Sequence, residues 1–203
     1  MVTLLSTRLP YPAQLELVEG LLFPSCYRDD EGRSFDRLRT SGLLINSPYL
    51  YAVALGSNRR SRFGGPRDTI RAAAAAIGAE RLSTVRSTLA LGPAGRGFAN
   101  AIAIVPTPLA PPALLASLKR IEETFGRRPG RRWGPRVLDL DIVLWSDGVW
   151  SGSGLAVPHP SFRQRRFVLQ PLAELVPLWR DPLTGLTIRQ LHARLERRRP
   201  VDP

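Results

Sequence analysis

A short segment in which apolar and acidic side chains alternate limits the fold of this chain more than any other feature. Residues 138–142 read Leu-Asp-Leu-Asp-Ile. Because successive residues of a β-strand point to opposite faces, the pattern predicts a strand with one face buried in a core. Asp139 and Asp141 would share the other face, with their Cα atoms about 7 Å apart.

Two carboxylates on one strand face repel each other unless a cation compensates their charge. Mg²⁺ prefers hard oxygen ligands, and it is commonly held by one or two carboxylates while water and substrate phosphates complete its shell. Asp139 and Asp141 are therefore candidate magnesium ligands. The alternative is an ordinary solvated strand face, which is the more common explanation when these two residues are taken alone.

The segment before the two aspartates is rich in arginine and glycine. It contains Arg127, Arg128, Arg131, Arg132 and Arg136 together with Gly126, Gly130 and Gly134. Metal-binding acids beside phosphate-binding arginines suit phosphoryl transfer, and the glycines would let the loop close over ATP. The sequence has no GxxxxGK[ST] phosphate-binding motif, and its single lysine, Lys119, falls in an expected helix.

The order of the expected elements predicts an α+β fold. Strand, helix, strand, strand, helix and strand follow one another, which is the order of a ferredoxin-like (split βαβ) sandwich with helices packed on a mainly antiparallel sheet. The expected strands are residues 49–55, 82–88, 98–106 and 137–145, and the expected helices are 66–77, 111–125, 168–175 and 188–198.

Residues 1–47 differ in charge from the rest of the chain. They contain five arginines and six acidic residues, so their net charge is −1 and the remainder of this +12 chain carries +13. We expect an N-terminal extension, poorly ordered or loosely docked, before a compact domain at residues 48–203. Within the extension, Leu15, Val18, Leu21 and Leu22 predict a short amphipathic helix.

The positive charge requires an anionic partner, which is either a small polyphosphate substrate or RNA. A basic RNA-binding ferredoxin-like module is the alternative function, but Asp139 and Asp141 among the arginines would repel an RNA backbone. Nucleic acid is therefore the less favoured partner. The single cysteine, Cys26, and the lack of a long apolar run predict a cytoplasmic protein without a membrane contact. The oligomeric state stays open.

Two smaller motifs carry possible ligand contacts. His159 lies between two prolines and close to Arg163, Arg165 and Arg166. A lone histidine more commonly has a structural role, but the neighbouring arginines make a phosphate contact the alternative. Phe98 and Asn100 are spaced to share one strand face. An aromatic ring and an amide suit a flat heterocycle, although core packing is the more common explanation when they are taken alone.

Together these segments resemble the 6-hydroxymethyl-7,8-dihydropterin pyrophosphokinase family between about Tyr51 and Arg194. The motifs that carry the resemblance are Ala54-Leu-Gly-Ser-Asn58, Phe98-Ala-Asn100, Ile121-Glu122, Gly126-Arg127, Arg132-Trp-Gly-Pro-Arg-Val-Leu-Asp-Leu-Asp-Ile142 and Val157-Pro-His159, followed by Arg165 and Phe167. The resemblance implies a ferredoxin-like fold. It also implies transfer of pyrophosphate from ATP to the hydroxymethyl group of the pterin, with release of AMP, in folate biosynthesis.

The resemblance also implies roles for individual residues. Two Mg²⁺ ions would bind Asp139 and Asp141, and the catalytic residues would be these two aspartates with Arg127 and Arg136. The implied ATP-binding residues are Glu122, Arg127, Trp133, Arg136, Ile142, His159 and Arg165. The implied pterin-binding residues are Thr88, Leu91, Phe98, Asn100, Trp133, Asp139 and Phe167, with Phe98 and Phe167 enclosing the pterin ring.

Overall fold

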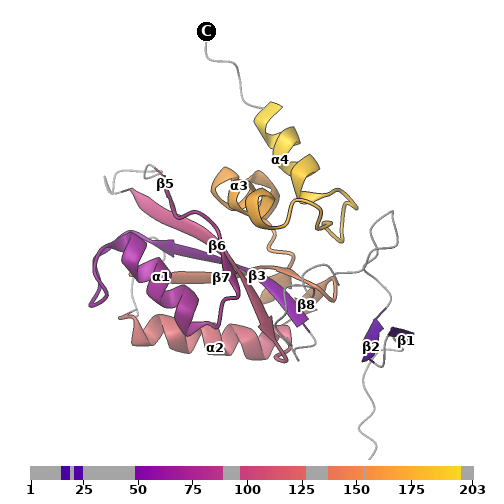
Figure 1. Ribbon diagram of the computed structural model, residues 1–203, viewed down its shortest axis with the longest axis horizontal. Coiled ribbons are helices and arrows are strands. Elements are labelled where there is room, and N and C mark those ends of the chain that lie inside the picture. The colour runs from indigo at the N-terminus through magenta and orange to yellow at the C-terminus, as the bar shows by residue number, and fades with distance from the viewer. Residues whose placement is uncertain are drawn as a thin grey trace, which may run out of the picture.

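The computed structural model describes residues 49–88, 97–126, 137–152 and 154–197, and the backbone of residues 15–18 and 21–24. The described chain is an α+β structure in which an antiparallel sheet lies between two layers of helices (Figure 1). Within these ranges, no helix combines the length and the apolar character that crossing a bilayer requires.

The sheet is built around β3 (Tyr49–Ser57), which pairs antiparallel with two long neighbours. These are β6 (Phe98–Thr107) and β7 (Asp139–Trp145). Two short strands, β4 (Arg81–Leu82) and β5 (Arg86–Thr88), pair with the other side of β6. The resulting order is β4-β6-β3-β7, with β5 beside β6, so β7 is an edge strand. The strand expected at residues 82–88 is thus present as two short pieces.

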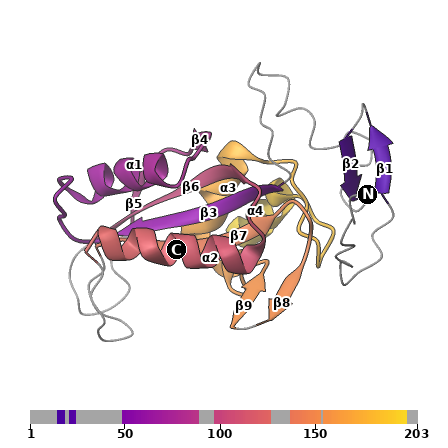
Figure 2. The same cartoon turned by 90° about the horizontal axis from the view of Figure 1, so that it is seen from below.

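Helices α1 (Pro66–Ala76) and α2 (Pro111–Thr124) cover one face of the sheet, as Figure 2 shows from below. Helix α1 begins with a proline in its first turn, and Asp68 accepts a hydrogen bond from the N–H of Gly65 there. Its buried alanines, Ala73 and Ala74, let the helix backbone approach the strands closely. Leu138, Leu140 and Ile142 of the alternating segment are all buried in this core.

The other face is covered over only part of its length. Helices α3 (Arg166–Leu175) and α4 (Ile188–Arg197) and the short 3-10 helix η2 (Phe162–Gln164) pack there. They bury the middle of the sheet through Ile102 and Ile104. Asp139 and Asp141, further along the same face, remain half-buried.

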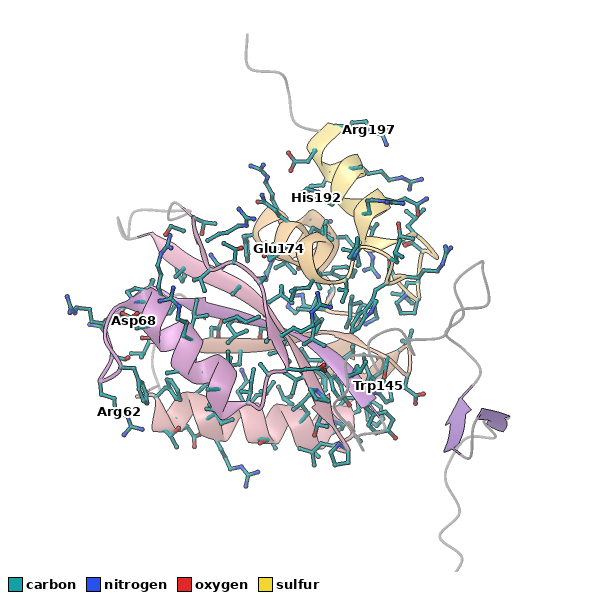
Figure 3. All side chains as sticks on the ribbon, in the orientation of Figure 1. Arg62, Asp68, Trp145, Glu174, His192 and Arg197 are labelled. Atoms are coloured by element: carbon teal, nitrogen blue, oxygen red, sulfur yellow. The ribbon has the colours of Figure 1, made fainter. Side chains whose placement is uncertain are left out.

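An aromatic cluster closes the far end of the sheet, near Trp145, which is labelled in Figure 3. The rings of Tyr51 and Trp145 are stacked, with centroids 6.2 Å apart. Tyr49 and Trp150 meet the Trp145 ring edge-on, and Trp150 begins the hairpin of β8 (Trp150–Gly152) and β9 (Leu155–Val157). Aromatic side chains thus fill this end of the sheet.

The amphipathic helix expected in the N-terminal segment is wrong. Residues Leu15–Val18 (β1) and Leu21–Pro24 (β2) are extended and pair antiparallel in a two-stranded sheet of their own. The sequence Glu19-Gly20 between the two apolar runs is a two-residue connection containing glycine, which favours a hairpin over a continuous helix. The rest of the predicted extension, and how it docks, lies outside the described residues.

The connection between α3 and α4 is held by a buried carboxylate. Asp181 is 0% exposed and accepts a hydrogen bond of 2.7 Å from Nε of Arg163, with a second bond from the same guanidinium. The hydroxyl of Thr184 and the N–H of Leu183 also donate to it. Burial raises the pKa of Asp181, but these donors outweigh it and hold the pKa below its ordinary value.

We expect Asp181→Asn to lower the free energy of unfolding at pH 7 by about 3 kcal/mol, because it leaves Arg163 without its buried anionic partner. Since the pKa of Asp181 is lowered in the folded state, its stabilisation is complete above the ordinary carboxyl pKa of about 4. It is lost as the pH falls through the lowered value. Urea denaturation at several pH values checks this, and the difference between variant and native protein should shrink in acid.

Asp68→Asn is the matched control for this prediction. Asp68 is exposed, and asparagine keeps an oxygen that accepts the Gly65 N–H. We expect its effect to stay below about 1 kcal/mol at every pH. Equal losses for the two variants would contradict the special role of Asp181.

Candidate active site

The two aspartates of β7 lie on one face of the sheet, as the alternating sequence predicts. Asp139 and Asp141 are half-buried, whereas the residues between and beside them are buried on the opposite face. In the register with β3, Asp139 lies opposite Gly56 and Asp141 lies opposite Ala54. The carboxylates therefore project from an edge strand over small residues of the central strand.

A row of residues runs from Asp139 across the sheet. Asp139 on β7 pairs with Gly56 on β3, and Gly56 pairs with Asn100 on β6. Asn100 in turn pairs with Arg86 on β5. A Cβ atom at Gly56 would lie 3.5 Å from Oδ1 of Asn100 and 3.9 Å from Cβ of Asp139. Because Gly56 has no side chain, a ligand that lies between the Asn100 amide and the Asp139 carboxylate can approach the backbone there.

The amide of Asn100 is held in one orientation. Its Nδ2 donates a hydrogen bond of 2.8 Å to Oγ1 of Thr88, and the residue is only 9% exposed. Its Oδ1 consequently faces the position above Gly56 as an acceptor. Phe98 is opposite Thr88 in the β5–β6 register and on the same side of β6 as Asn100. Three of the predicted pterin-binding residues are thus brought together here.

Two hydrogen bonds hold His159, one from its backbone to β7 and one to its ring. Its N–H donates to the carbonyl oxygen of Val143 over 3.0 Å, and its Nδ1 accepts the N–H of Ser161 over 3.1 Å. An Nδ1 that accepts a hydrogen bond leaves the proton of the neutral ring on Nε2. Burial lowers the pKa of His159, the charge of Arg165 adds to this, and Asp141 and Asp139 oppose it. The ring is therefore an Nε2–H donor near the carboxylates.

Arg165 and Phe167 lie together at the start of α3. The guanidinium carbon of Arg165 is 5.8 Å from the centroid of the Phe167 ring, which is partly buried against the core beneath α3. Arg165 is half-buried and close enough to His159 to influence its pKa. The first turn of α3 thus brings a cation and an aromatic ring to the histidine.

Two of the predicted nucleotide-binding side chains are buried. Glu122 is 0% exposed on α2, where its Oε1 accepts the backbone N–H of Leu140 over 2.7 Å. Ile142 is 2% exposed in the core beneath α1 and α2. Any ligand contact by Ile142 is therefore left to its backbone groups. Four further predicted site residues, Leu91, Arg127, Trp133 and Arg136, lie outside the described residues.

Three residues near the site were not singled out from the sequence as ligand-site residues. Gly56 stands within a recognised motif, but only the register shows that it separates Asn100 from Asp139. Lys119 precedes Glu122 by three residues, a spacing that places two side chains on one helical face. Glu174 of α3, labelled in Figure 3, accepts hydrogen bonds from Thr84 and Arg86 and so ties α3 to the edge near β5. No local sequence pattern predicts the contact of Glu174 with Thr84 and Arg86.

The donor atoms around β7 fit a hard divalent cation that brings further ligands with it. In the part of the chain that the structure describes, no group of three or more histidine, cysteine, aspartate or glutamate side chains is arranged to hold a metal ion. Asp139 and Asp141 offer two carboxylates on one face, which matches the way Mg²⁺ binds together with substrate phosphates. The two residues therefore fit magnesium that arrives with a phosphate ligand.

Curated proteins provide clear relatives of this chain. The 2-amino-4-hydroxy-6-hydroxymethyldihydropteridine pyrophosphokinase of Synechocystis is 43% identical over 117 residues, which are 58% of this chain and 60% of that protein. The protein of the same name from Pseudomonas aeruginosa is 43% identical over 139 residues, which are 64% of this chain and 82% of the relative. This chain thus spans less than two thirds of the first relative and more of the second.

Solved structures support the fold. The Plasmodium falciparum HPPK-DHPS wild-type structure matches with a TM-score of 0.53 at 14% identity, covering 72% of this chain and 41% of that one. An HPPK-DHPS structure in complex with substrates gives a TM-score of 0.55 at 12% identity and covers 73% of this chain and 43% of that one. At these identities the likeness concerns the fold alone.

A family model supplies the most direct assignment. The model of 7,8-dihydro-6-hydroxymethylpterin-pyrophosphokinase (HPPK) matches residues 52–177, which include most of β3, all of β6 and β7, both aspartates and His159. Because this match covers more than half of the chain, the protein belongs to the 7,8-dihydro-6-hydroxymethylpterin-pyrophosphokinase family.

Proposed function

We propose that this protein transfers pyrophosphate from ATP to the hydroxymethyl group of 6-hydroxymethyl-7,8-dihydropterin, releasing AMP, as a step of folate biosynthesis. The observation that carries the proposal is the row formed by Asp139, Gly56 and Asn100 on one sheet face. With Asp141 on the same face, the row combines a carboxylate pair for metal-bound phosphates with an oriented amide for a heterocycle. Family membership supports the same reaction.

The pterin would lie over Gly56, next to Asn100. Oδ1 of Asn100 is available as an acceptor because Thr88 already binds its Nδ2, and a pterin edge offers N–H donors. Phe98 lies next to this amide, and Phe167 would supply the second ring of the enclosure. Leu91 and Trp133 remain predictions for this pocket.

The triphosphate of ATP would extend from the aspartates towards His159 and Arg165. Nε2–H of His159 can donate to a phosphate oxygen, and Arg165 adds a charge-assisted donor beside it. Arg127 and Arg136 would neutralise further phosphate charge, and they remain predictions. Glu122 and Ile142, whose side chains are buried, would support the nucleotide site from behind.

Asp139 and Asp141 would hold the Mg²⁺ ions that accompany ATP, for which we propose two. When bound, the ions would neutralise the phosphate oxygens and align nucleophile and leaving group. The pterin hydroxyl oxygen would attack the β-phosphorus and release its proton to solvent, while the bond from that phosphorus to the α,β-bridging oxygen breaks and AMP leaves. The chain contributes mainly orientation: Asn100 fixes the pterin, while His159 and Arg165 fix the phosphates.

We also propose that the fold is the ferredoxin-like type of split βαβ sandwich. What supports this is the strand order β4-β6-β3-β7 with antiparallel neighbours, together with helices α1 and α2 in the two crossovers. The boundary near residue 48 and the cytoplasmic location remain proposals. The single cysteine in the sequence supports the cytoplasmic location.

The direct test incubates the protein with ATP, Mg²⁺ and the reduced pterin and measures AMP. AMP formation that requires the pterin supports the proposal. A parallel salt-dependent RNA-binding assay tests the alternative, because an RNA-binding module would retain RNA and form no AMP.

We expect Asp139→Ala and Asp141→Ala each to lower AMP formation at least about 100-fold, because each removes charge compensation from the reacting phosphates. Both side chains are half-buried on the sheet face, so the melting temperature should change little. Asp147→Asn is the matched control, since Asp147 lies in the turn after β7 and away from the row. Near-native AMP formation by either alanine variant would refute the metal assignment.

We expect Asn100→Ala to raise the KM for the pterin about 10- to 100-fold and to leave the KM for ATP nearly unchanged, because the variant removes the oriented acceptor. Thr88→Val should act in the same direction but more weakly, since it frees the amide to rotate without removing it. Steady-state kinetics with each substrate varied in turn would measure both constants. An Asn100→Ala variant with a raised KM for ATP alone would contradict this placement of the pterin.

A further inference from the structure

Helix α2 contains an ion pair for which the proposed chemistry gives no direct role. Nζ of Lys119 donates to Oε1 of Glu122 over 2.8 Å, and the Glu122 side chain is 0% exposed while that of Lys119 is 39% exposed. Removing a carboxylate from water is costly unless donors satisfy its oxygens, and replacing such a pair with apolar residues is often neutral. Stability alone is therefore a weak explanation for this pair.

Both side chains bind the backbone of the same residue of β7. Oε1 of Glu122 accepts the N–H of Leu140 over 2.7 Å, and Nζ of Lys119 donates to the carbonyl oxygen of Leu140 over 3.3 Å. An edge strand directs the backbone groups of alternate residues away from its neighbour. Lys119 thus provides the donor, and Glu122 the acceptor, that another strand would provide. We call these two residues the edge clamp.

Leu140 lies between the two aspartates in the sequence. Its side chain is 0% exposed in the core, and its backbone is held by the edge clamp, so both its face and its edge contacts are fixed. Planar peptide bonds join Leu140 to Asp139 on one side and to Asp141 on the other. Holding Leu140 therefore limits how far the two carboxylates can move relative to each other.

We infer that Lys119 and Glu122 are positioning residues that hold Asp139 and Asp141 at the separation required by a metal-bound triphosphate. The inference rests on the proposed function and assigns Glu122 an action through the strand instead of on the nucleotide. Groups that orient metal ligands commonly change metal affinity or activity 10- to 100-fold when they are removed.

The first test compares native protein with Glu122→Ala. In hydrogen–deuterium exchange the amide of Leu140 should exchange faster in the variant, because its acceptor is gone. Mn²⁺ is the probe of the metal site. Its binding in the presence of a non-hydrolysable ATP analogue, followed by electron paramagnetic resonance, should weaken about tenfold or more. The exposed neighbour Glu123 provides the control, and Glu123→Ala should change neither measurement.

The second test separates hydrogen bonding from charge. In the double variant Lys119→Met/Glu122→Gln, glutamine keeps an oxygen for the Leu140 N–H, and both charges of the Lys119–Glu122 pair are removed together. We expect this variant to recover most of the Leu140 amide protection and Mn²⁺ binding that Glu122→Ala loses. Should Glu122→Ala fail to fold, the double variant Lys119→Met/Glu122→Leu takes its place, since it also removes the acceptor of the Leu140 N–H and should give the same faster exchange and weaker Mn²⁺ binding.

Two outcomes would overturn the inference. A Glu122→Ala protein that melts earlier but keeps native Mn²⁺ binding would make the pair merely structural. A variant that binds the ATP analogue weakly while Leu140 exchange is unchanged would make Glu122 a direct nucleotide ligand. If the native protein forms no AMP, the proposed function fails, whereas the exchange and Mn²⁺ measurements still test the edge clamp.

Discussion

The site depends on how β7 is held at the edge of the sheet. An edge strand has one row of backbone groups without a strand partner, and such a row has to be covered, bonded or left to water. Here α2 bonds Leu140 through Lys119 and Glu122, and the loop before α3 bonds Val143 through the N–H of His159. The strand that carries both candidate metal ligands is therefore fixed on its open side as well as by β3.

The two helical layers differ in extent where the candidate site lies. The core beneath α1 and α2 buries Leu140 and Ile142 of β7, which fixes the face on which Asp139 and Asp141 lie. Helices α3 and α4 stop short on the other face, where Asp139 and Asp141 stay half-buried beside Gly56 and Asn100 (Figure 1). The start of α3 brings Arg165 and Phe167 to the same region as His159.

Most of the framework could be predicted from the sequence because its patterns are local. Alternation in residues 138–142 gave the strand and its two faces, and proline and glycine marked the ends of α1 and α2. The hairpin at residues 15–24 was missed because four apolar positions at helical spacing also occur in two short strands. The buried position of Glu122 and the contact of Glu174 with Arg86 were beyond sequence reasoning, since both depend on packing between elements far apart in the chain.

An irregularity in β7 shows why local pattern has a limit. The register with β3 shifts between Ala52 and Val53, so Val143 is an extra residue in the β7 strand. Val143 and Leu144 consequently both join the core beneath α3, and strict alternation ends after Ile142. Bulges bend a strand and redirect its groups, and they are frequent beside active sites. Here the carbonyl of the extra residue receives the His159 N–H, which brings the ring close enough to Asp141 to influence its pKa. The break in alternation thus adds the histidine to the carboxylate pair that the alternation itself creates.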